Sequence, residues 1–226
     1  MSTEFNGWRE EGESTLYFPG CIGLGRLTDL TASVSSLLTT LGIAHDISRE
    51  ALCCGSPLLK IGAQDMADDL RRRNAKVFSR YDRIITSCPG CTFQLREVYG
   101  IEAEHVIEVL KGMDLSSQLE GRWALQVPCH LKRGLSPWTA EGLAIILEGA
   151  GVDVVRVPGE DDCCGGGGGM LSGFPETSGS MARNKVEMYH RAGVDGVITA
   201  CPFCSLNLRR EGLRVLDIGE AITLKR

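Results

Sequence analysis

The chain has 226 residues, of which 43% are hydrophobic and 23% charged, and a net charge of −5. This length suits one large or two small globular domains, and the mild acidity, without a basic stripe, excludes a general nucleic-acid binder. The longest apolar runs, such as residues 143–147, are far too short for the ~20 residues of a membrane span. Residues 1–13 are polar and lack the pattern of a secretory signal. We therefore expect a cytoplasmic protein, whose thiols stay reduced.

The first half of the chain alternates short strands with helices. Leucines and valine at 27, 30, 34, 37, 38 and 41 recur at the spacing of one buried helical face. Residues 1–14 are expected to form a flexible tail, and Tyr17 and Phe18 to lie in the core. The expected strands are 16–18, 43–47 and 83–86, and the expected helices are 28–41, 64–79, 92–99 and 104–111.

The second half repeats this order. The expected strands are 123–127, 152–155, 196–199 and 213–218, and the expected helices are 139–148, 178–191 and a segment from 201 to about 210. Matching cysteines in the two halves are offset by 108 to 113 positions, which indicates a tandem duplication. Strands that alternate with helices predict parallel βαβ units. The fold class is therefore α/β with two pseudo-symmetric halves. The expected division is a tail at 1–14, a first half at 15–112, a connection at 113–121 and a second half at 122–226.

All 10 cysteines fall into two matched sets of five. The spacing is C-x31-C-C-x33-C-x2-C in the first set and C-x33-C-C-x36-C-x2-C in the second. Three segments of each set follow expected strands, and ligands of open α/β sheets gather at the carboxyl ends of strands. Each set should therefore converge on one place. The first set is Cys21, Cys53, Cys54, Cys88 and Cys91, and the second is Cys129, Cys163, Cys164, Cys201 and Cys204.

Several chemistries use cysteines in such patterns. Five disulfides do not suit a cytoplasmic chain of this size, and adjacent cysteines bridge poorly. Purely structural cysteines would not explain two matched sets. A thioredoxin-like C-x-x-C fits the strand–helix context of Cys88 and Cys91 but ignores the adjacent pairs. A four-thiolate zinc site would leave six cysteines idle. Iron–sulfur clusters use thiolate ligands, although an ordinary cubane needs four and each half offers five.

The motifs around these cysteines resemble the cysteine-rich CCG domain found in the B-type subunit of heterodisulfide reductase and its relatives, over about residues 16–210. The segments that carry the resemblance are FPGC at 18–21, CCG at 53–55, CPGC at 88–91, CHL at 129–131, CCGG at 163–166 and CPFC at 201–204. The resemblance implies that each set of five cysteines holds one [4Fe-4S] cluster of the non-cubane type. It also implies that the two clusters face each other across a cavity in which a disulfide is split.

This resemblance sets the expected function and partners. We expect an oxidoreductase subunit that reduces or forms a disulfide. The alternatives are an electron-transfer subunit of a flavin-dependent 2-hydroxy-acid or related dehydrogenase, without its own substrate, and a zinc-bound structural module. The chain has no additional C-x2-C-x2-C-x3-C-P run of the ferredoxin type, so its electrons should come from a separate iron–sulfur or flavin subunit. Its length is nearer the small subunits of lactate-utilisation systems.

For other residues near the cysteines the sequence leaves both a functional and a structural role open. His130 is a candidate proton donor to a leaving thiolate, with a packing role as the alternative. Lys132 and Arg133 could meet an anionic substrate or lie in solvent. The glycine run at 165–169 lacks the residues of a phosphate loop, and it is expected to let the backbone approach a cluster. His45, His105 and His190 are expected to be ordinary structural residues.

Overall fold

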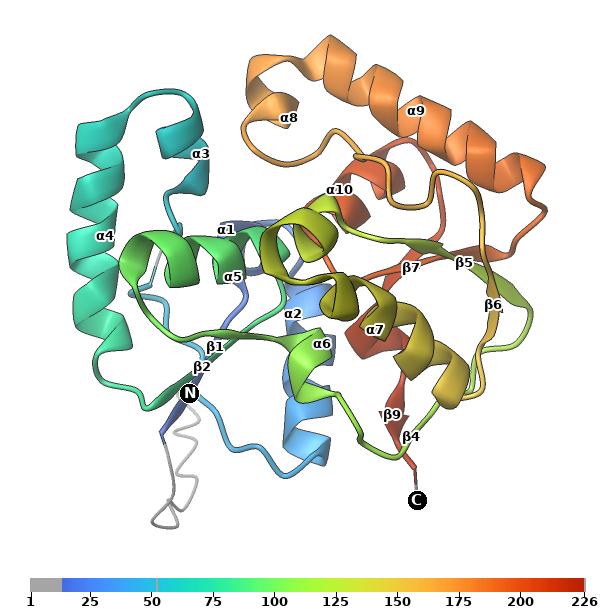
Figure 1. The fold of residues 1–226 in the computed structure, drawn as a ribbon, viewed down its shortest axis with the longest axis horizontal. Coiled ribbons are helices and arrows are strands. Elements are labelled where there is room, and N and C mark those ends of the chain that lie inside the picture. The colour runs from blue at the N-terminus through green and yellow to red at the C-terminus, as the bar shows by residue number, and fades with distance from the viewer. Residues whose placement is uncertain (1–13, 52, 226) are drawn as a thin grey trace, which may run out of the picture.

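The computed structural model describes residues 14–51 and 53–225. Most of the expected tail, residues 1–13, lies outside them. The described chain is an α/β protein with two parallel sheets, one from each half, as the sequence predicted (Figure 1). Within the described residues no helix is long and apolar enough to cross a membrane.

The first sheet has three parallel strands in the order β1-β2-β3: Thr15–Phe18, Arg83–Thr86 and Glu104–His105. Tyr17 and Phe18 are buried in it, as predicted. The expected strand at 43–47 is reduced to one parallel bridge between Leu16 and Asp46. The expectation was wrong here because the His45 ring contacts the Ser35 hydroxyl and the carbonyl oxygen of Ile43. That carbonyl is then not available for hydrogen bonds to a neighbouring strand.

The second sheet has four parallel strands in the order β6-β5-β7-β8: Asp153–Val155, Arg122–Gln126, Gly196–Thr199 and Val215–Asp217. The order matches the first sheet, with β5, β7 and β8 in the places of β1, β2 and β3. Strand β6 takes the place of the single bridge at Asp46. A separate antiparallel pair joins β4 (Leu115–Ser116) to β9 (Thr223–Leu224), which ties the expected connection to the end of the chain.

The helices follow the duplication. The first half has α1 (Gly20–Gly25), α2 (Thr28–Thr40), α3 (Ser56–Lys60), α4 (Gln64–Phe78), α5 (Pro89–Gln94), the π-helical turn η1 (Leu95–Tyr99) and α6 (Val106–Val109). The second half has the π-helical turn η2 (Leu131–Leu135), α7 (Pro137–Gly149), α8 (Met170–Gly173), α9 (Pro175–Arg191), α10 (Pro202–Arg210) and α11 (Ile218–Ala221). The expected helix at 104–111 was partly wrong, since its first two residues pair as β3.

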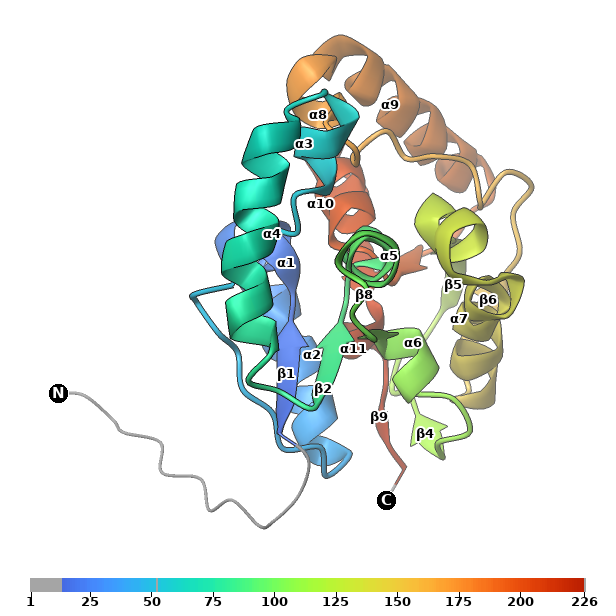
Figure 2. The same cartoon turned by 60° about the vertical axis from the view of Figure 1, so that its left-hand side comes forward.

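The two halves pack through helices that cross from one to the other. Helix α6 follows β3 and packs on α7 of the second half, whereas α11 follows β8 and packs on α2 of the first (Figures 1 and 2). The largest buried apolar cluster contains residues from all four helices and from both sheets. Because burial of this shared apolar surface stabilises both halves at once, the two halves hold a fixed relation to each other.

Matching capping boxes begin the two crossing helices. His105 begins α6 and receives the N–H of Ile107, while Asp217 begins α11 and receives the N–H of Gly219. Arginine side chains brace both turns: Arg96 bonds Glu108 in the first half, and Arg209 bonds Glu220 in the second, at 2.7 Å in each case. Satisfying the free N–H groups at a helix start stabilises such short helices.

Candidate functional site: a cysteine-lined cavity

One cavity is lined by all ten cysteines. It encloses about 930 Å³ of empty space, part of it open to solvent. The prolines and glycines that precede or follow the cysteines line it as well, together with Lys60, His130 and Phe203. The duplication therefore brings both predicted sets to a single place between the halves.

The ends of four strands bring cysteines to this cavity. Cys21 lies in the first turn of α1, directly after β1, and Cys129 follows β5 at the matching position. Cys88 and Cys201 follow β2 and β7, where they are the residues that cap α5 and α10. Two further contacts bring the halves together here, since α1 packs on α10 and η2 packs on α5.

The adjacent cysteine pairs are held by a left-handed glycine turn. Gly55 and Gly165 follow them with φ of 81° and 77°, a backbone conformation that favours glycine. In each turn the glycine N–H donates to the first cysteine of the pair at 3.4 Å, on Cys53 Sγ and Cys163 Sγ respectively. The motif Cys-Cys-Gly thus folds the backbone so that its own amide supports a sulfur.

Buried side chains fix the backbone of both turns. In the first half Asn74 donates to the carbonyl of Cys53 at 2.7 Å, and Tyr99 donates to that of Cys54 at 3.2 Å. In the second half Asn207 donates to the carbonyl of Cys164 at 2.7 Å. Sequence reasoning missed these residues, because their chain distance from the cysteines hides the contact.

Hydrogen bonds between thiols organise the first set. Bonds from Cys21 and then Cys54 lower the pKa of Cys53 to about 3. The bond with Cys53 raises the pKa of Cys54 to about 12, although its bond with Cys91 acts in the opposite direction. Bonds from Cys201 and Cys91, helped by backbone N–H groups of α5, hold the pKa of Cys88 well below its usual range. The first set therefore favours thiolate, the form that binds metal, at Cys53 and Cys88.

Of these pKa shifts, the second set shares only the lowered pKa of the first cysteine of the adjacent pair. The bond from Cys129 lowers the pKa of Cys163 to about 6. The Sγ atoms of Cys164 and Cys204 lie 3.2 Å apart, and this bond lowers the pKa of Cys164. Both cysteines of this adjacent pair are therefore more acidic than a free thiol.

The two sets touch through Cys88 and Cys201. Their thiols are hydrogen-bonded, and both residues are buried. The bond between Cys201 and Cys204 lowers the pKa of Cys201, but the bond to Cys88 and burial outweigh it, and that pKa is raised well above its usual range. The ten thiols consequently form one continuous sulfur-rich lining.

The donor set fits an iron–sulfur cluster in its chemistry. Five thiols in each half are soft ligands, and Gly20 leaves room where a Cβ would lie 2.9 Å from Cys91 Sγ. As the side chains are placed, no three His, Cys, Asp or Glu among the described residues form a group that could hold a metal ion. The thiols instead pair with one another, and a cluster would require pairs such as Cys164 and Cys204 to separate around it.

Two cationic or titratable side chains lie at the cavity. Lys60, at the end of α3, places Nζ 3.3 Å from His130 Nε2, and His130 Nδ1 lies 3.5 Å from Cys129 Sγ. Burial lowers the pKa of His130, and the charge of Lys60 lowers it further. Lys60 also lies against Gly168, where a Cβ would be 3.4 Å from its Nζ. The Lys60–His130 contact thus joins the two halves, and sequence reasoning missed Lys60.

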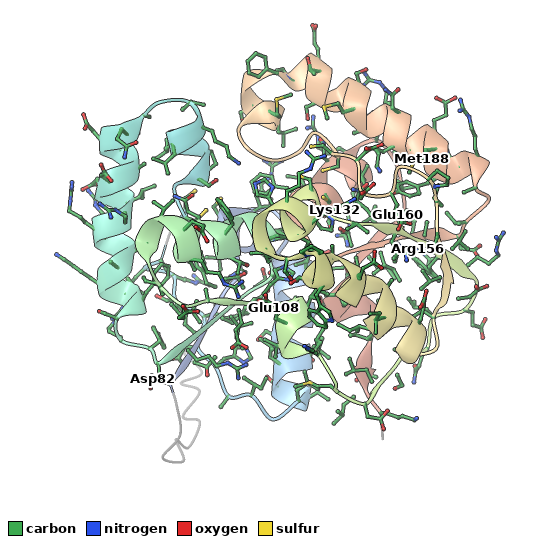
Figure 3. The ribbon with its side chains drawn as sticks, viewed as in Figure 1. Asp82, Glu108, Lys132, Arg156, Glu160 and Met188 are labelled. Carbon is green, nitrogen blue, oxygen red and sulfur yellow. The ribbon has the colours of Figure 1, made fainter. Side chains whose placement is uncertain are left out.

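Lys132 lies elsewhere. It forms an ion pair with Asp161 and lines a separate cleft with Arg156 and Glu160, and the three labelled side chains lie over the second half in Figure 3. Arg156 and Glu160 are themselves paired at 2.6 Å. The role expected of Lys132 toward a substrate stays a prediction, and Lys60 is the lysine that lines the cysteine cavity.

Fold and site together define a duplicated α/β protein whose halves share a cavity lined by two cysteine sets. The cysteine-rich CCG family matches residues 15–96 and 123–209, and the chain belongs to this family. It is similar to a subunit of the fumarate reductase (CoM/CoB) of Methanothermobacter marburgensis, with 33% identity over 92% of this chain and 45% of that protein.

Two further relatives extend the comparison. An uncharacterized iron–sulfur protein of Methanocaldococcus jannaschii is 33% identical over 85% of this chain and 40% of its own length. A subunit of the dihydromethanophenazine:CoB–CoM heterodisulfide reductase of Methanosarcina acetivorans is 27% identical over 92% of this chain and 57% of its own length. The chain spans only about half the length of these curated relatives.

Proposed function

We propose that this protein is an iron–sulfur redox subunit of the heterodisulfide reductase type that reduces or forms a disulfide within a larger complex. One observation carries the proposal: ten cysteines from two homologous halves line one cavity. The names of the relatives, an iron–sulfur protein and a heterodisulfide reductase subunit among them, support it.

The proposed ligands are the two sets of five cysteines, each holding one [4Fe-4S] cluster of the non-cubane type. When bound, such clusters supply single electrons and an iron atom that can bind sulfur. The protein contributes thiols, of which Cys53, Cys88, Cys163 and Cys164 have lowered pKa values, and the glycine N–H groups at the two turns. Domains follow the same division, with halves at 15–112 and 122–226 and a connection at 113–121.

The proposed reaction joins one disulfide, two electrons and two protons to give two thiols, or the reverse. The S–S bond breaks, both sulfur atoms are reduced, and each takes a proton. A partner subunit that carries an iron–sulfur or flavin group supplies or accepts the electrons. The His130 ring places Nδ1 close to Cys129 and Nε2 close to Lys60, so it is positioned to give a proton to a product thiolate.

The first experiment is an anaerobic count of iron, sulfide and zinc in the purified chain. Two [4Fe-4S] clusters require about eight iron atoms and about eight sulfide ions per chain. Zinc without iron would exclude any redox function. The second experiment adds small disulfides to the chemically reduced protein and follows the cluster absorbance. Oxidation with release of two thiols per disulfide is expected, and reduced protein that responds to no disulfide would indicate an electron-transfer subunit instead.

A further inference from the structure

A buried lysine distinguishes the two cysteine sets electrostatically. Lys185 on α9 is only 5% exposed, and its Nζ donates to the carbonyl of Gly159 at 2.5 Å. The same Nζ lies 5.3 Å from the centre of the Tyr189 ring. In the described part of the chain, Lys185 forms no ion pair with a carboxylate. Tyr189 packs in one buried cluster with Cys164 and Cys204, which places Lys185 beside the second cysteine set. The Lys185 charge interacts with Asp162, Cys204, Cys164 and Asp161.

The first half has a neutral residue at the matching position. Gly55 packs on Ala67 of α4, and Gly165 packs on Ser178 and Met181 of α9, with Ala67 and Ser178 at matching positions of their helices. Seven residues further, two helical turns along the same face, α4 carries Asn74 and α9 carries Lys185. Both side chains are buried, and both donate to a backbone carbonyl in the segment that leads to the adjacent cysteines. The halves therefore differ by one buried positive charge.

Neighbouring carboxylates offset this charge only in part. Asp161 is already paired with Lys132, and Asp162 is exposed, so solvent screens it. Lys185 itself is shielded from solvent by α9 and by the loop at Gly159. A charge in a poorly hydrated site interacts more strongly with its surroundings than one in water.

We propose that Lys185 raises the reduction potential of the centre held by the second cysteine set above that of the first. The inference rests on the proposed function. Reduction adds negative charge to an iron–sulfur centre, and a nearby buried cation stabilises the reduced form. An electron from the partner subunit first reduces the centre of the first half. It then passes to the centre of the second half, which has the higher potential. The first centre is thereby oxidised again and can accept the next electron. The two halves thus act in order although their ligands match.

The test is a potentiometric titration of the anaerobically reconstituted full chain, followed by electron paramagnetic resonance. Wild type should show two distinct potentials. Lys185→Met should lower only the higher one, so that the reduced fraction at a fixed potential falls about tenfold relative to the oxidised, or ~59 mV for one electron. Lys185→Arg keeps the charge and should keep the potential. Arg191→Gln removes an exposed charge from the same helix and should change neither.

Failure of the inference and failure of the proposed function give different results. Two equal potentials in wild type, or unchanged potentials in Lys185→Met with full iron, would overturn the role of Lys185 and leave the function standing. A wild-type chain that binds no iron would overturn the function itself. Should Lys185→Met not fold, Lys185→Gln gives the same readout, because its amide can still donate to Gly159.

Discussion

Cys88 and Cys201 occupy matching positions in the two halves, and their thiols are hydrogen-bonded to each other. Each caps a helix that packs on the opposite half, α5 on η2 and α10 on α1. A sulfur contact between the two cysteine sets is thus built into the interface between the halves. A substitution on either side of that interface should consequently alter the surroundings of both cysteine sets.

The second cysteine of each adjacent pair tests the five-ligand sites. Cys54→Ala or Cys164→Ala should lower the iron content of the reconstituted chain toward half, or alter the spectrum of one cluster, because one thiolate ligand is lost. Iron and sulfide analysis with electron paramagnetic resonance checks the result. Ser56→Ala, beside the first pair, is the matched control. Full iron with an unaltered spectrum in both cysteine variants would contradict the proposed ligand sets.

Lys60 is expected to bind anionic groups at the mouth of the cavity. Under the proposed function, Lys60→Gln should raise KM for a disulfide that carries carboxylates about tenfold, or ~1.4 kcal/mol of binding free energy. The value of kcat and the KM for an uncharged disulfide should stay unchanged. Steady-state kinetics with the two disulfides measures this difference. Lys76→Gln is the control, since Lys76 is an exposed lysine of α4 that does not line the cavity. Equal losses in both variants would argue against a specific role for Lys60.

Asp217 makes stability depend on pH. Burial raises its pKa from 3.8 to about 8, and its Oδ2 finds no hydrogen-bond partner among the described residues. The folded state therefore keeps a proton that the unfolded chain releases, so the free energy of unfolding falls as pH rises toward 8, by up to about 1.4 kcal/mol per pH unit. Asp217→Asn should remove this slope while its side chain still caps Gly219.

The titration of His105 sets the lower limit of the pH range in which the Asp217 slope is measured. Burial lowers its pKa from 6.5 to about 4, so its contribution to stability is lost as pH falls below 6.5. The slope from Asp217 has the opposite sign. Because the lowered pKa values of Cys53, Cys88 and Cys163 also act between pH 6.5 and 8, the Asp217 slope is taken as the difference between wild type and Asp217→Asn. Urea unfolding at these two pH values, for wild type and Asp217→Asn, gives the comparison. An identical pH dependence in the two proteins would contradict a protonated Asp217.

Each crossing helix meets the other half at a glycine. Helix α11 supplies the glycine itself, Gly219, against Val34 of α2, whereas α6 supplies Ile107 against Gly142 of α7. A Cβ on Gly219 would lie 2.8 Å from the backbone nitrogen of Val34, whereas a Cβ on Gly142 would lie 3.1 Å from a methyl of Ile107. Gly219→Ala should therefore cost ~1–3 kcal/mol of unfolding free energy, and Val34→Ala should not restore it because backbone is in the way.

Gly142→Ala is the matched comparison. Its clash is with a side chain, so Ile107→Ala in the same protein should relieve part of it, which a double-mutant cycle in denaturant detects as a coupling energy. Simple additivity at both contacts would show that the crossing helices adjust freely.

The sequence alone determined the duplication, the α/β class and the two cysteine sets, because strand and helix periodicity and the spacing of rare residues are local properties of the chain. It also predicted Tyr17 and Phe18 as core. It could not find Lys60, Asn74 or Lys185 as neighbours of the cysteines, nor the loss of the strand at 43–47. These depend on contacts between residues far apart in the chain, and only the packing of α3, α4 and α9 around the cavity decides them. Tertiary structure likewise decided that both sets share one cavity, since the crossing of α6 and α11 fixes the halves against each other.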